Sequence, residues 1–171
     1  MESAWKVVLA ASLLVLALLN VRYYLRVSPD LRVLQPTLQA LSPDLLREKQ
    51  PVVLAERIVD HEQLLRANFR YEYFLARKST TEVAKSTPCR AKYTVLFHDF
   101  QHDFQRSQVQ VDISHPIDKS QVVRVLLDAR QTLVLPAHWK FSTSAPCHCW
   151  KLFDFVHAAM ALFNVDALVW A

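Results

Sequence analysis

The residues best suited to chemistry are three cysteines, two of which lie close together near the end of the chain. Cys147-His148-Cys149 places two thiols one residue apart with an imidazole between them, and Cys89 is the third cysteine. Structural zinc takes four sulfur or nitrogen ligands, so these thiols and one histidine could form a site, although the usual two-residue gap is absent. A disulfide from Cys89 to Cys147 or Cys149, which needs an oxidising compartment, is the second interpretation, and unpaired thiols are the third.

Histidine and aspartate also occur together in the segment from Phe97 to Phe104. His98-Asp99 and His102-Asp103 lie four residues apart, so on a helix both pairs could face the same way and approach a metal. An exposed loop or strand turn is the simpler interpretation of this polar stretch. No nucleophile-elbow motif singles out a serine, so the sequence does not indicate a Ser-His-Asp hydrolase.

Composition excludes several classes of function. The chain has 171 residues, about one domain, and contains no glycine. Dinucleotide-binding loops, Walker A loops and kinase glycine loops all depend on glycine, so the chain carries none of them. Its net charge of +4 is too small to indicate nucleic-acid binding, and its 52% apolar content predicts a folded core.

The N-terminal segment has the pattern of a membrane anchor. Val7–Val21 carries no charge and spans roughly 22 Å, and snorkelling of the flanking cations extends Ala4–Leu25 towards the ~30 Å of a bilayer core. The bulky, basic exit around Arg22 does not suit cleavage, so an uncleaved anchor over residues 1–27 is favoured over a cleaved signal peptide or a buried core helix. The residues expected to flank the anchor at the lipid–water interfaces are Trp5, Lys6, Arg22, Tyr23, Tyr24 and Arg26.

Flanking cations also predict the orientation of this anchor. Arg22, Arg26 and Arg32 follow the apolar stretch, whereas Lys6 is offset by Glu2 before it. Positively charged flanks stay on the cytoplasmic side, so we expect a single-pass protein whose domain faces the cytoplasm. The same arginines could attract anionic lipid headgroups, at about 1 kcal/mol each.

Behind the anchor, we expect a linker over residues 28–42 and a β-rich domain over residues 43–171. Short helices are predicted at Pro43–Lys49, with Ser42 as the N-cap, and at His61–Ala67. Apolar runs or alternation indicate strands at residues 52–55, 69–73, 91–97, 109–113, 121–127 and 132–135. Residues 78–88 and 98–106 are typical of polar loops, and residues 152–163 of a closing helix packed on the sheet rather than a second membrane span. Strands grouped between helices favour an antiparallel sandwich or barrel.

Two segments resemble the cupin-like proteins related to JmjC hydroxylases. Leu127 to Phe141, which includes Leu133-Val134-Leu135-Pro136-Ala137-His138-Trp139, is similar to the late strand pair of that family. Pro51-Val52-Val53, after a short helix, resembles the family's first strand. The two segments frame residues 45–141. The resemblance implies a mainly-β domain, a double-stranded β-helix or cupin-like sandwich with short flanking helices.

The same resemblance implies that the family's metal chemistry is lost. Active members hold iron(II) with a His-x-Asp/Glu pair and a later histidine. Here the position of the later histidine is Phe141, the family glycine before the last strand is Arg130, and no His-x-Asp or His-x-Glu occurs in the chain. On a strand, the adjacent His-Asp pairs would point to opposite faces. We therefore expect no metal, no cofactor and no catalytic residue.

Together these patterns predict a membrane-anchored, non-enzymatic structural protein whose domain binds other proteins. The layout also resembles uncharacterised membrane proteins of large DNA viruses. That likeness implies a virion component that links an inner membrane to the capsid, with the domain on the cytoplasmic or capsid side. The alternative function is a membrane-bound iron(II)/2-oxoglutarate oxygenase with displaced ligands, and the third is a redox or zinc-dependent module built on the three cysteines.

Overall fold

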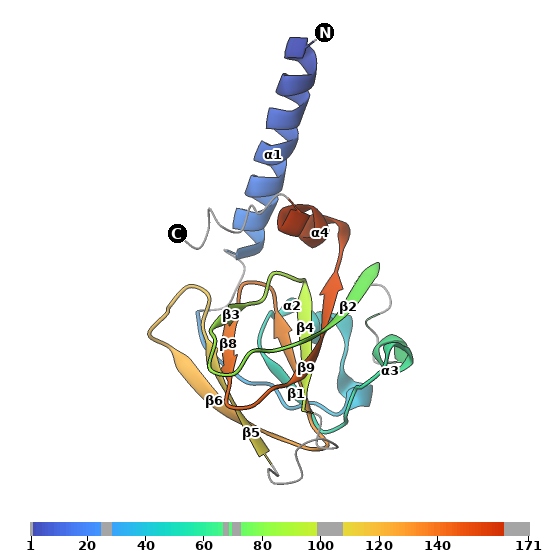
Figure 1. Ribbon diagram of the computed structural model, residues 1–171, viewed down its shortest axis with the longest axis vertical. Coiled ribbons are helices and arrows are strands. Elements are labelled where there is room, and N and C mark those ends of the chain that lie inside the picture. Colours follow the sequence, from blue (N-terminus) through green and yellow to red (C-terminus); the bar gives the residue numbers. More distant parts are fainter. Residues whose placement is uncertain (1, 25–28, 67–68, 70–72, 99–107, 163–171) are drawn as a thin grey trace.

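The described part of the chain folds into two antiparallel sheets and four α-helices (Figure 1). The computed structural model describes residues 2–24, 29–66, 69, 73–98 and 108–162. The five-stranded sheet has the order β1 (Val52–Leu54), β7 (Thr132–Pro136), β4 (Tyr93–Phe97), β9 (His148–Phe153) and β2 (Leu75–Thr80). The four-stranded sheet has the order β3 (Thr87–Pro88), β8 (Lys140–Thr143), β5 (Gln108–Ser114) and β6 (Val122–Asp128). The helices are α1 (Glu2–Tyr24), α2 (Pro43–Arg47), α3 (His61–Arg66) and α4 (Phe155–Leu162), and a 3-10 turn covers Leu38–Ala40.

The main core lies where the two sheets face each other. On β5, Val109, Val111 and Ile113 are fully buried, and the polar residues between them point outward, as the period of two requires. Leu133 and Leu135 of the five-stranded sheet belong to the same buried cluster. The apolar residues that alternate with polar ones in this part of the sequence therefore face the core, and the polar residues face solvent.

A second apolar cluster covers the outer face of the five-stranded sheet. Leu41, Leu46, Ile58 and Phe69 pack against it, so every residue of β4 and β7 is buried. Helix α2 begins where predicted, because the Ser42 Oγ accepts a hydrogen bond from the Leu45 backbone N at 3.2 Å. The segment before it also joins the fold, since Leu34 forms a parallel bridge with Val52.

Most predicted elements are confirmed, and the differences fall around β2, β3, β8 and β9. Strand β3 lies in the predicted loop over residues 78–88, and no strand was predicted over β8. Residues 78–80, predicted as loop, continue β2 and pair with β9. Leu152 and Phe153, predicted as the start of the closing helix, end β9 instead, because β9 pairs with β4 on one side and β2 on the other. Helix α4 then begins after Asp154, whose Oδ1 accepts a hydrogen bond from the His157 backbone N at 2.8 Å. The predicted strand over residues 69–73 and the loop over residues 98–106 fall largely outside the described residues.

Helix α1 projects away from the sheets, and α4 lies beside the end of α1 that joins the domain (Figure 1). Among the residues that the structure describes, no helix has both the length and the apolar content needed to cross a bilayer. The membrane anchor over residues 1–27 stays a prediction.

Candidate functional site

The two segments that carry the family resemblance are neighbours in space. Strand β1 pairs antiparallel with β7, with Val52 opposite Val134 and Leu54 opposite Thr132. The Trp139 side chain, just after β7, donates a hydrogen bond from Nε1 to the Lys49 backbone O at 2.9 Å, just before β1. Two antiparallel sheets with these segments side by side are compatible with the predicted cupin-like fold.

Phe141, the residue that the resemblance aligns with an iron-binding histidine, is a core side chain. Phe141 lies on β8 opposite Ile113 and is 2% exposed within the main core. Among the described ranges, no group of three or more His, Cys, Asp or Glu side chains is arranged to hold a metal ion. Phe141 therefore contributes apolar packing at this position, and the described residues offer no set of displaced ligands.

A buried polar cluster lies under α4. It consists of Lys49, Lys92, His138, Asp154 and His157. His157 donates from Nδ1 to the Asp154 Oδ1 at 2.7 Å, and the Lys92 Nζ lies 3.6 Å from the Asp154 Oδ2. Burial raises the pKa of Asp154, but the hydrogen bonds and charge of His157, with the charge of Lys92, outweigh burial and lower it below its usual value. The carboxylate thus stays ionised and ties the start of α4 to Lys92, just before β4.

His138 is the most unusual member of this cluster. Its backbone φ is 74°, in the left-handed region, and its side chain is 2% exposed. That conformation costs roughly 1–2 kcal/mol for a residue other than glycine. The turn is held by the segment before β4, because the His138 N donates to the Cys89 O at 2.9 Å and the Ala137 N donates to the Lys92 O at 2.9 Å. Burial, together with the charges of His157 and Lys49, lowers the pKa of His138 to about 4.

The buried polar cluster has the side chains of an acid–base site, but a substrate could not reach them. Both of its histidines are 2% exposed. A neutral His138 beside Lys49 could accept a proton only at a considerable cost in a low-dielectric setting. The arrangement therefore holds a helix against the sheet, and two of its members, Lys49 and His138, have left-handed backbone angles.

The three cysteines are all buried, free thiols near one another in the main core. The Ser79 Oγ lies 3.0 Å from the Cys149 Sγ, and the Cys147 backbone N donates to the Thr81 Oγ1 at 2.9 Å. Burial raises the pKa of Cys89 and of Cys147 to about 12, and nearby Cys149 adds to both shifts. The thiolate is the nucleophile and metal ligand, so these thiols are poorly suited to either role. The predicted disulfide is not formed in this structure, and its formation in an oxidising compartment stays a prediction.

The predicted histidine–aspartate pairs do not form a described site. His98 is buried and donates from Nδ1 to the Pro146 backbone O at 3.1 Å, and residues 99–107 lie outside the described part of the chain. His115 is also buried, and its Nδ1 accepts hydrogen bonds from the backbone N of Ile117 and Asp118 at 3.3 and 3.0 Å. Its ring meets Trp139 edge to face, which makes it part of a turn rather than a ligand.

The predicted anchor residues lie on or beside α1. Trp5 and Lys6 are exposed at its free end, and Arg22 is exposed in its last turn. The side chains of Tyr23 and Tyr24, and all of Arg26, lie outside the described residues. Ser12, within the uncharged stretch, donates from Oγ to the Val8 backbone O at 2.9 Å, so the helix satisfies this hydroxyl internally.

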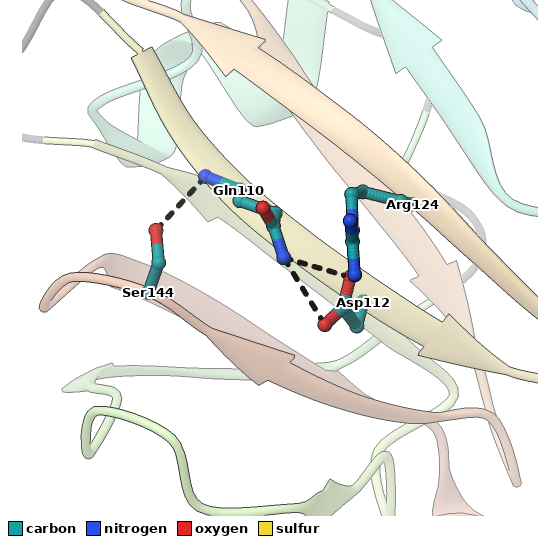
Figure 2. A network of polar contacts seen from close by, with 4 residues as sticks. All are labelled: Gln110, Asp112, Arg124 and Ser144. Atoms are coloured by element: carbon teal, nitrogen blue, oxygen red, sulfur yellow. Dashed lines mark hydrogen bonds and ion pairs between the residues drawn. The ribbon is translucent and has the colours of Figure 1, made fainter.

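The outer face of the four-stranded sheet carries a polar network (Figure 2). Exposed apolar side chains lie next to this network on β6. The Arg124 Nε donates to the Asp112 Oδ1 at 3.0 Å, the Gln110 Nε2 donates to the same carboxylate, and the Ser144 Oγ accepts from the Gln110 N. Val122 and Leu126 lie on the same face of β6 as Arg124 and are more than half exposed. A groove of about 300 Å³ runs beside β6, which is at one edge of the four-stranded sheet.

Comparison with known proteins adds little to this description. No family model matches the chain, and no curated protein matches it. Among solved structures, the chain is similar to RmlC from Streptococcus suis, determined in complex with dTDP-D-xylose, with a TM-score of 0.35 and 10% sequence identity. The match covers 57% of this chain and 55% of that chain.

Sequence reasoning missed two groups of residues that the structure brings together. The buried polar cluster combines Lys49 after α2, Lys92 before β4, His138 in the turn after β7, and Asp154 and His157 at the start of α4, and no motif in the sequence joins them. The second group is the exposed aromatic pair Phe74 and Phe155, whose rings stack 4.1 Å apart at the base of α1. The apolar segment that predicted a closing helix, residues 152–163, contains Phe155 but not Phe74.

Proposed function

We propose that this protein is a membrane-attached, non-enzymatic interaction protein, in which α1 holds the β domain at a lipid bilayer. The observation that carries the proposal is the surface of α1. Eight large apolar side chains of α1 are exposed: Trp5, Val7, Val8, Leu14, Val15, Leu18, Leu19 and Val21. Leu9, Leu13 and Leu16, which are half-buried, extend the apolar surface to the remaining side of the helix. A helix that is apolar all round is normally covered by protein or by lipid.

The polar groups of α1 also suit an apolar surrounding. Lys6 and Arg22 bracket the uncharged stretch, and Ser12 is satisfied by the helix backbone. In lipid, polar groups need such internal partners, because no water is present to replace them. Basic side chains at the ends can reach the headgroups, which supports lipid rather than a protein groove as the cover.

The domain itself supports a binding role rather than catalysis. Its candidate acid–base groups and thiols are buried, and Phe141 packs where the resembling family places an iron ligand. The edge strand β6 offers exposed Val122 and Leu126 beside a groove, the kind of apolar surface that protein partners use. The viral likeness of the sequence predicts that this partner is a capsid protein, and this identity stays a prediction.

Vesicle flotation of the full chain tests the membrane part of the proposal. We expect the wild-type protein to float with phosphatidylcholine–phosphatidylserine vesicles and a Leu14→Asp/Leu18→Asp variant to stay at the bottom of the gradient. Leu126→Asp on β6 is the matched control, because it places a charge on an equally exposed leucine remote from α1. Equal flotation of the α1 variant and the wild type would overturn the proposal.

Metal and product analysis tests the non-enzymatic part. The full chain, purified and supplied with iron(II) and 2-oxoglutarate, is expected to retain no stoichiometric iron and to release no succinate. Stoichiometric iron or succinate would establish the oxygenase alternative.

A further inference from the structure

Helix α4 has an unusual composition for a helix at the surface of a domain. None of its residues, Phe155–Leu162, carries a carboxylate, a lysine or an arginine. His157 and Met160 form its buried face. Phe155 and Leu162 lie seven residues apart, two helical turns, and are 76% and 79% exposed on another face. An outward face of this kind would normally carry charged residues, and its apolar character indicates that something covers it.

Phe74 extends this apolar surface from α4 onto the sheet. It precedes β2 and is 50% exposed, and its backbone N donates to the Phe153 O at 3.0 Å. Its ring stacks on the Phe155 ring at 4.1 Å between centroids with an angle of 14°. We call Phe74, Phe155 and Leu162 the apolar collar. Stacking fixes the two rings as one flat apolar surface rather than two separate side chains.

The location of the apolar collar identifies what covers it. Helix α4 contacts α1 and lies at the end of α1 that joins the domain (Figure 1). A bilayer that surrounds α1 would therefore reach its boundary close to the collar. Arg22, exposed in the last turn of α1, supplies a cation at the same level for anionic headgroups.

From this geometry, and resting on the proposed membrane attachment of α1, we infer that the apolar collar inserts into the lipid surface and holds the domain against the bilayer. Aromatic and aliphatic side chains presented on one face partition into the boundary between headgroups and acyl chains. The domain would then have a defined orientation on the membrane. β6 and its exposed side chains, which lie on the opposite sheet, would remain available to a protein partner.

Fluorophores placed at single sites on the full chain test the inference. An environment-sensitive nitrobenzoxadiazole probe is attached in turn to the variants Phe155→Cys, Leu162→Cys, Leu14→Cys and Leu126→Cys. Wild-type protein treated in the same way is the control for labelling of the three buried native thiols. Each protein is mixed with phosphatidylcholine–phosphatidylserine vesicles, with and without lipids that carry a nitroxide quencher just below the headgroup. We expect a blue shift at positions 155, 162 and 14, quenching by the shallow nitroxide at positions 155 and 162, and neither effect at position 126.

The four positions separate the two proposals. A probe in lipid at position 14 but in water at 155 and 162 would overturn the apolar collar and leave the membrane attachment standing. A probe in water at position 14 as well would overturn both. Circular dichroism of each labelled protein checks that the substitutions, all at exposed sites, leave the fold intact.

Discussion

Lowering the pH should destabilise the domain through His138. The structure lowers the pKa of this histidine to about 4, whereas an unfolded histidine titrates near 6.5. Between these pH values the histidine is protonated in the unfolded chain and neutral in the folded chain. The contribution of His138 to the free energy of unfolding is therefore fully present above about pH 6.5 and is lost as the pH falls to about 4. Integrated over this window, the effect is about 3 kcal/mol at pH 4.

His138→Asn isolates this contribution. Asparagine does not titrate and tolerates the left-handed backbone at this position better than most residues. Guanidinium unfolding of the full chain in mild detergent, followed by tryptophan fluorescence, gives the free energy of unfolding at each pH. We expect the wild type to lose about 3 kcal/mol more than the variant between about pH 7 and about pH 4.

Other titrating groups near His138 do not mimic this result. Asp154, whose pKa is lowered, adds stability that is present above its unfolded pKa and is lost as the pH falls through its folded value. That loss occurs in both proteins and cancels in the comparison. Parallel stability curves for wild type and His138→Asn would show that the surroundings of His138 do not disfavour its charge, and the reasoning about the buried polar cluster would fail.

Three further predictions concern the core. Trp139→Phe leaves the buried Lys49 carbonyl without its 2.9 Å donor and should cost about 1–3 kcal/mol in chemical unfolding, while Trp150→Phe, whose indole bond is longer and less buried, should cost less. Phe141→His places a polar ring in the main core, so it should lower stability by about 1–3 kcal/mol more than Phe141→Leu, and iron measured on the purified variant should stay at background. The native protein should give no reaction with a thiol reagent, because its thiols are buried with raised pKa values, and the denatured protein should titrate all 3; a single thiol after denaturation without reductant would instead establish the disulfide.

The sequence predicted the elements whose signal is local. Alternation at Val109, Val111 and Ile113 appears directly in the chain, and so does the Ser42-Pro43-Asp44 start of α2. Strand β9 was missed because Leu152 and Phe153 also fit a helical spacing with Val156. These residues form a strand because β9 pairs with β2 and β4, which lie far away in sequence.

Site residues were harder to predict for a similar reason. Apart from the neighbours Asp154 and His157, the members of the buried polar cluster lie far apart in sequence, and they meet because the turn after β7 packs against the segment before β4. The apolar collar was hidden in a run that indicated only a closing helix. Composition could show that α4 lacks charge, but exposure of Phe155 depends on which face α4 turns to the sheet.

The pairing of β1 with β7 has a consequence for how the chain acquires its fold. These strands lie about 80 residues apart, and such distant partners slow folding because a long loop must close first. The β5–β6 hairpin can form on its own as soon as it is synthesised, but β1 must wait for β7 to leave the ribosome. At about 5–20 residues per second, that wait lasts several seconds, during which α1 and β1 have already emerged with apolar surfaces uncovered. Early capture of α1 by a membrane would shorten the period in which nascent chains could aggregate.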